Sequence, residues 1–230
     1  MKRDASADAR FAGTSGRLLL FLLAVTACLL ALRLWHICAD FPSYHFYSQE
    51  RARFTDEGFY TSAALDYFAL GRAYIPGGWN PGVFMPVWPL LAGLLFHFTG
   101  VSVAAARSLA VVCTWLGVLL AYAVARQYRS QTFACLTAFL IAANALGFFY
   151  GRLALLEPAQ VMFLLLAIYL SGKVRPGSYG LAAAIGIVFV VATLTKTSTP
   201  FLLPAVLYPI WAKNRETPRS SAWKLLAVTL

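Results

Sequence analysis

Long apolar runs dominate the chain, and short polar segments separate them. The runs cover residues 18–38, 84–99, 101–125, 131–150, 158–171, 179–195, 198–212 and 223–230. About 20 consecutive apolar residues are enough for a helix to cross a bilayer, and several of these runs approach or exceed that length. The pattern therefore predicts an all-α polytopic membrane protein.

The composition narrows the class further. The chain is 60% apolar and 12% charged, whereas a soluble domain is about half apolar and roughly a quarter charged. This excludes a water-soluble enzyme, a disordered tail and a disulfide scaffold. The net charge of +10 does not indicate a nucleic-acid partner, because Lys and Arg lie in short groups between apolar runs, as in cytoplasmic loops. The four cysteines have no CxxC spacing and are interpreted as packing residues.

The basic clusters predict the topology. They are the N-terminal tail, Arg126 with Arg129, Lys173 with Arg175, and the group at 213–224. All four clusters lie in the cytoplasm together only if run 84–99 does not cross the membrane. That run is short and contains Pro86 and Pro89, which favours an interfacial or re-entrant segment on the outer side.

The predicted organisation follows from this topology. It comprises a cytoplasmic tail (1–17), a first transmembrane helix (18–38), an extracytoplasmic loop with amphipathic juxtamembrane helices (39–100), a transmembrane bundle of about five helices (101–212), a basic cytoplasmic loop (213–222) and the start of a further helix (223–230). Within the outer loop, residues 61–70 predict a short amphipathic helix.

Three places on the predicted outer side could carry chemistry. Asp56 and Glu57 are adjacent carboxylates, suited to work as a base or to stabilise a helix N-terminus. Glu157 precedes Pro158 at the start of an apolar run, where it is either functional or a partner of the helix dipole. Lys196 is a lone cation between two apolar runs, suited to bind a lipid phosphate or to snorkel to the surface.

These three places lie on the same predicted side of the membrane, and together they indicate a function more strongly than each does alone. Transfer from a phosphorylated lipid needs a carboxylate that takes a proton from the acceptor hydroxyl or amine, and a cation that stabilises the phosphate leaving group. Arg33, inside the first run, is interpreted as a packing or snorkelling residue.

Four segments, in their order along the chain, resemble glycosyltransferase family 39. They are 55–60 (Thr-Asp-Glu-Gly-Phe-Tyr), 85–90 (Met-Pro-Val-Trp-Pro-Leu), 152–158 (Arg-Leu-Ala-Leu-Leu-Glu-Pro) and 194–196 (Leu-Thr-Lys). This family includes the protein O-mannosyltransferases, the aminoarabinose transferase of lipid A and the rhizobial lipopolysaccharide glycosyltransferases. Met85 and Phe59 stand where relatives of the aminoarabinose transferase carry Lys and Arg.

The resemblance implies a C-type membrane glycosyltransferase fold and an inverting transfer from a polyprenyl-phosphate sugar to a lipid, glycan or protein. The implied catalytic residues are Asp56 as base, Glu57 and Glu157; those implied at the donor phosphate are Lys196, Arg72 and Arg152. No dedicated metal site is expected, although a divalent cation on the carboxylates stays open. The expected location is the bacterial inner membrane, with the N-terminus cytoplasmic and the active site extracytoplasmic.

Two alternatives stay open from the sequence. A transporter or flippase of lipid-linked sugars would also carry buried charges and proline-broken spans. The second alternative is a non-catalytic fragment of a transferase. It stays open because members of the family are about twice as long, with further spans, and because Leu230 lies inside an apolar run.

Overall fold

The computed structural model describes residues 5–39, 55–78, 80–214, 224 and 227–229, and over these residues the chain is helical without any strand. Its elements are α1 (Ala5–Ala31), η1 (Leu32–Leu34), α2 (Thr55–Leu70), η2 (Pro81–Val83), α3 (Val87–Thr99), α4 (Val103–Tyr128), α5 (Gln131–Ala143), α6 (Ala145–Tyr150), α7 (Leu156–Ser171), α8 (Tyr179–Thr195), η3 (Thr199–Leu202) and α9 (Leu203–Asn214). The all-α prediction is confirmed for this part. Most of the loop predicted at 213–222, and parts of 39–100 and 223–230, lie outside the described residues.

Two helical stretches have the length and apolar character needed to cross a membrane, namely Gly16–Leu34 and Val103–Tyr128. Both carry large apolar side chains that face outward, among them Leu20, Phe21 and Leu119. Exposing such apolar surfaces to water is unfavourable in free energy, and contact with lipid chains removes them from water. The chain therefore has the features of a membrane protein.

Helix α3 corresponds to the run that was predicted not to cross. It has 13 residues, or about 20 Å of helix at about 1.5 Å per residue, against a hydrocarbon core about 30 Å thick. It ends at Gly100, whose positive φ of 76° is a backbone conformation that favours glycine. Its length supports an interfacial position, which stays a prediction.

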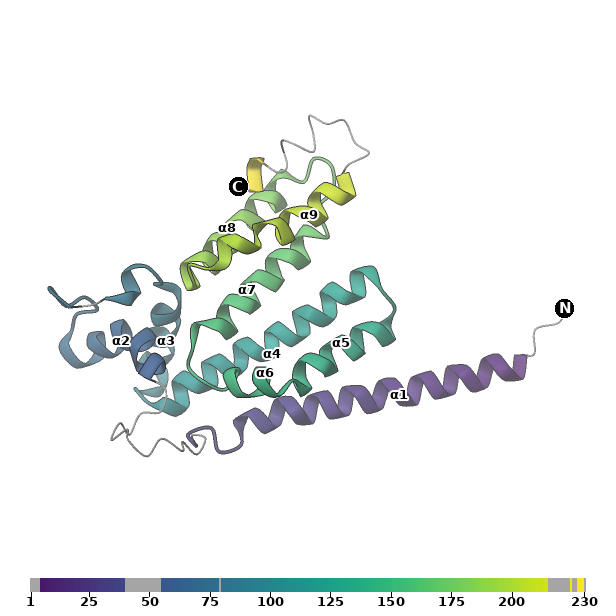
Figure 1. Cartoon of the computed structure of the whole chain (residues 1–230), viewed down its shortest axis with the longest axis horizontal. Helices are drawn as coiled ribbons and strands as arrows, with labels where there is room; N and C mark the ends of the chain where they lie inside the picture. Colours follow the sequence, from purple (N-terminus) through teal and green to yellow (C-terminus); the bar gives the residue numbers. More distant parts are fainter. Residues whose placement is uncertain (1–4, 40–54, 79, 215–223, 225–226, 230) are drawn as a thin grey trace.

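The helices form an elongated bundle with α2 and α3 clustered at one end (Figure 1). Helix α7 packs against α4 on one side and against α8 and α9 on the other, while α1 packs along α5. Toward the end that holds α2 and α3, helix α1 ends, α4 and α7 begin, and α8 ends (Figure 1). Residues from distant parts of the sequence therefore meet there.

Trp88 fixes α2 and α3 to this end of the bundle. It is fully buried in a cluster of small and apolar side chains from α2, α3, α4 and α7, including Ala64, Ala106 and Leu156. Its indole Nε1 donates a hydrogen bond to the hydroxyl of Thr61 on α2 at 3.2 Å. Small residues let helix backbones approach closely, so the start of α2 is held against the loop that precedes α7.

Candidate active site

The carboxylate of Glu57 joins three separate segments. Arg107 of α4 donates from Nε to Oε1 at 2.8 Å and from Nη2 to Oε2 at 2.6 Å, and the backbone N–H of Ala154 donates to Oε1 at 2.7 Å. The side chains of Arg107 and Glu57 are 4% and 15% exposed. Arg107 also donates to the carbonyl of Ile37 at 2.9 Å, just beyond α1. Glu57 is thus a structural anchor that holds α2 to α4 and to the loop before α7.

Asp56, its neighbour, has a different environment. It lies in the first turn of α2, where a carboxylate is favoured by the helix dipole. It is exposed and makes no hydrogen bond or ion pair with any other described residue. The two adjacent acids therefore differ in environment, because hydrogen-bond donors surround the Glu57 carboxylate and the Asp56 carboxylate is exposed.

Glu157 and Lys196 form an ion pair between Nζ and Oε1. Glu157 lies in the first turn of α7, and Lys196 directly follows α8. The Lys196 and Glu157 side chains are 29% and 42% exposed, so solvent screens part of their attraction. Gln160 also donates to the hydroxyl of Thr199 at 3.0 Å, which ties α7 to the segment after Lys196. The second carboxylate oxygen of Glu157 is buried without a partner among the described residues.

Arg152 lies in the loop before α7 and binds the segment that follows η1. Its Nη2 donates to the carbonyl oxygens of Trp35 at 2.7 Å and His36 at 2.8 Å. Burial lowers the pKa of the Arg152 guanidinium from its usual value, and the nearby charge of Arg107 lowers it further. Arg152 therefore lies in the same end region as Glu57 and Glu157.

Arg72, the third predicted phosphate ligand, follows α2 and is exposed. It contacts neither Glu157 nor Lys196 through any hydrogen bond or ion pair among the described residues. The structure thus brings Glu57, Arg152, Glu157 and Lys196 to one end of the bundle, with Asp56 beside Glu57, and leaves Arg72 on the exposed loop.

Arg107 was missed by the sequence reasoning. It lies inside the apolar run 101–125, where it was counted as part of a span. The sequence did contain one indication of its importance, namely a charged residue inside an apolar run, because an ionisable side chain within an apolar helix needs a partner. Its partner Glu57 lies 50 residues away, and no local pattern links the two.

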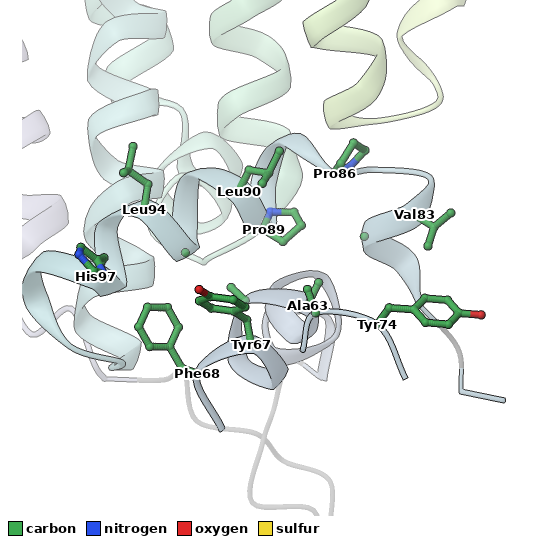
Figure 2. Close-up of a pocket in the computed structure, with 14 residues that line it drawn as sticks. Ala63, Tyr67, Phe68, Tyr74, Val83, Pro86, Pro89, Leu90, Leu94 and His97 are labelled. Atoms are coloured by element: carbon green, nitrogen blue, oxygen red, sulfur yellow. The ribbon is translucent and has the colours of Figure 1, made fainter. Parts of the chain in front are cut away.

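A cavity of about 460 Å³ lies between α2 and α3. Figure 2 shows Ala63 and Tyr67 of α2 on one side, and Pro89, Leu90 and Leu94 of α3 on the other. Ala63 and Tyr67 follow Asp56 by seven and eleven residues, which places all three on one face of α2 at about 3.6 residues per turn. The cavity is mainly apolar and therefore suits a hydrophobic chain.

No group of three or more His, Cys, Asp and Glu side chains that could hold a metal ion occurs within the described part of the chain. Asp56 and Glu57 are adjacent, but Glu57 is already bound to Arg107. A divalent cation as cofactor therefore stays a prediction.

A family model described as dolichyl-phosphate-mannose-protein mannosyltransferase matches residues 80–230. The chain belongs to this family. The resemblance stated from the sequence is thus confirmed, and the protein is a membrane glycosyltransferase of the family 39 type. The matched region contains Arg107, Arg152, Glu157 and Lys196, and it begins after Asp56 and Glu57. No curated protein and no solved structure matches the chain.

Proposed function

We propose that the protein transfers a sugar from a polyprenyl-phosphate-linked donor to a hydroxyl or amine of an acceptor on the extracytoplasmic side, with inversion at the anomeric carbon. Family membership supports the glycosyltransferase class. The acceptor heteroatom forms a bond to the anomeric carbon, the bond to the phosphate oxygen breaks, and the acceptor proton passes to a carboxylate. The polyprenyl phosphate leaves with the electron pair of the broken bond.

The observation that carries this proposal is the contrast between the two adjacent acids. Glu57 is saturated by Arg107 and Ala154, whereas Asp56 is exposed and has no partner among the described residues. A general base needs a carboxylate that is open to the acceptor and held in place. Asp56 is the base, and Glu57 is the positioning residue that fixes the first turn of α2.

The cations of the same end region serve the leaving group. Lys196 and Arg152 offer positive charge for the phosphate there, and Arg72 offers it from the exposed loop after α2. Charge that develops on a leaving phosphate is stabilised by such groups. Glu157 holds Lys196 through their ion pair and presents its second oxygen for a hydroxyl of the sugar or acceptor. A lipid, glycan or protein acceptor fits this chemistry equally.

The proposed location is the bacterial inner membrane, with the N-terminus cytoplasmic and α2 and α3 on the outer surface. The basic clusters support this orientation. The rate of sugar transfer, measured with and without EDTA, tests whether the reaction requires a divalent cation.

The test is transfer of a radiolabelled sugar from a polyprenyl-phosphate donor in membranes that contain the protein, its Asp56→Asn variant or its Asp66→Asn variant. Asp66 lies on the same helix and is not part of the site, so it controls for loss of one carboxylate from α2. We expect Asp56→Asn to lower the transfer rate by about 100-fold or more, and Asp66→Asn to leave it within about twofold.

Equal rates for the two variants would refute Asp56 as the base. If the unaltered protein moved labelled lipid across the bilayer and formed no glycoside, the transporter interpretation would replace the transferase.

A further inference from the structure

A second cavity lies at the end of the bundle opposite to the candidate active site. It has a volume of about 610 Å³ and lies where α4 and α7 end, beside the last part of α9 (Figure 1). That volume is within the range of about 300–1,000 Å³ that is typical of ligand sites. Part of the lining is apolar, with Ile168, Pro209 and Ala212, and part is polar, with Gln127 and Lys213 among the residues. The cavity is therefore amphipathic.

The side-chain amide of Gln127 has a buried oxygen without a partner. Its Nε2 donates to the carbonyl of Tyr169 at 2.9 Å. Tyr169 lies in the last turn of α7, where carbonyl groups have no donor within the helix, so this position needs the nitrogen of the amide. Oε1 is buried and accepts no hydrogen bond from any described residue. Because buried polar atoms are nearly always paired, this oxygen indicates a ligand that carries a hydrogen-bond donor.

Cations gather at this end of the bundle. Lys213 lines the cavity, and its Nζ donates to the carbonyl of Gly172 at 2.8 Å, which uses one of the three N–H bonds of the ammonium. Further cations lie in the last turn of α4 or follow α4 and α7, namely Arg126, Arg129, Lys173 and Arg175. None of these side chains forms an ion pair with a carboxylate in the ranges that the structure describes. An anionic group is therefore attracted to this end, and Lys213 has donors left for it.

Aromatic side chains indicate that the cavity lies at the depth of lipid headgroups. Tyr128 and Tyr208 line the cavity and are exposed. Trp211 is also exposed, and its ring centroid lies 6.0 Å from that of Tyr208. Exposed Tyr and Trp side chains are enriched at the membrane–water interface. Basic pockets between helices at that depth on the cytoplasmic side bind anionic headgroups.

We infer that this cavity binds an anionic glycerophospholipid of the phosphatidylglycerol type, from the leaflet at this end of the bundle, which is the predicted cytoplasmic leaflet. The phosphate accepts hydrogen bonds from Lys213, and a hydroxyl of the headgroup glycerol donates to Oε1 of Gln127. The acyl chains leave along the apolar part of the lining.

The chemistry of the cavity selects this headgroup among the common ones. Phosphatidylcholine has the phosphate but no hydrogen-bond donor for Gln127. Phosphatidylethanolamine has a donor but no net charge to match the cations. The inference does not depend on the proposed transfer reaction, because the candidate active site lies at the other ends of α4 and α7.

The experiment titrates the purified full chain, in an uncharged detergent, with short-chain phosphatidylglycerol, phosphatidylethanolamine or phosphatidylcholine. A lipid that binds the folded state raises Tm with its concentration, and this dependence gives an apparent Kd. The first variant is Lys213→Gln, which removes the charge that binds the phosphate. The second is Ala212→Phe, which adds a large side chain to the lining and leaves Lys213 and Gln127 in place.

Matched controls separate the site from general effects. Arg17→Gln removes one charge from an exposed position of α1 on the same predicted side of the membrane. Ala205→Phe makes the same change on α9, at an exposed position that does not line the cavity. We expect Lys213→Gln and Ala212→Phe each to weaken phosphatidylglycerol binding by about tenfold or more, and both controls to stay within about twofold.

The lipid comparison tests the headgroup. We expect the unaltered protein to bind phosphatidylglycerol about tenfold or more tightly than either other lipid. Equal affinity for phosphatidylglycerol and phosphatidylcholine would overturn the inference, as would an unchanged affinity in Lys213→Gln or Ala212→Phe. Equal affinity for phosphatidylethanolamine would overturn the assignment to an anionic lipid. If Ala212→Phe fails to fold, Lys213→Gln, at an exposed position, decides.

Discussion

Removing the charge of Glu57 is the sharpest test of the anchor at the start of α2. The Glu57→Gln variant keeps the length of the side chain and one oxygen that can accept from Ala154 or Arg107. It loses the second oxygen, which accepts from Nη2 of Arg107 at 2.6 Å, and it loses the negative charge. Arg107, whose side chain is 4% exposed, then stays buried without the carboxylate of Glu57.

The structure gives the expected magnitude. A hydrogen bond to a charged group contributes about 1.5–3 kcal/mol, and breaking a buried pair by removing one partner costs about 3–5 kcal/mol. Because the amide of the variant keeps one bond, and because Glu57 is 15% exposed, we expect a loss of about 3 kcal/mol in the free energy of unfolding. For a chain of this size that lowers Tm by about 6–12 °C.

The assay is thermal unfolding in detergent, followed by tryptophan fluorescence. The control is Asp56→Asn, the same chemical change one residue earlier at an exposed position, and we expect it to change stability by less than about 0.5 kcal/mol. An Arg107→Gln variant and the double variant complete a cycle, for which we expect a coupling energy of about 2 kcal/mol. Equal Tm values for Glu57→Gln and Asp56→Asn, or a coupling energy near zero, would refute the anchor.

Two further predictions concern packing around the site. Thr61→Val leaves the buried indole N–H of Trp88 without its acceptor, so we expect a loss of about 1–3 kcal/mol and altered Trp88 emission, whereas Thr61→Ser should keep both near normal. Gly151→Ala places a Cβ 2.6 Å from the carbonyl of Gly147 and 2.9 Å from the Thr114 hydroxyl. We expect it to destabilise by about 1–3 kcal/mol; a normal Tm would contradict the close approach.

The helices that the structure shows follow from information that is local in the sequence. Apolar runs predicted helices, and the prolines and length of run 84–99 predicted a short one, which is α3. Boundaries were less accurate. The helix expected at 61–70 begins at Thr55 instead, because Asp56 and Glu57 are favourable in a first turn. Helix α1 begins at Ala5, inside the predicted tail, where alanines favour helix.

The pairing of charges could not be predicted, because it depends on distant contacts. Glu157 and Lys196 were both chosen from the sequence, but their ion pair joins positions 39 residues apart. Arg33 was interpreted as a packing or snorkelling residue, and its hydrogen bond to the carbonyl of Ala142, 109 residues away, forms only when α1 packs against α5. The sequence therefore indicated candidate residues, and the structure shows what each of them contacts.

The anchor at Glu57 also constrains the order of biogenesis. Arg107 and Ala154 follow Glu57 by 50 and 97 residues. At a synthesis rate of about 5–20 residues per second, Ala154, the last of the donors to Glu57, is synthesised about 5–20 s after Glu57 itself. Helix α2 is therefore made early and docked late, and a chain arrested before residue 154 would present the candidate base on a segment that has not yet acquired its final position.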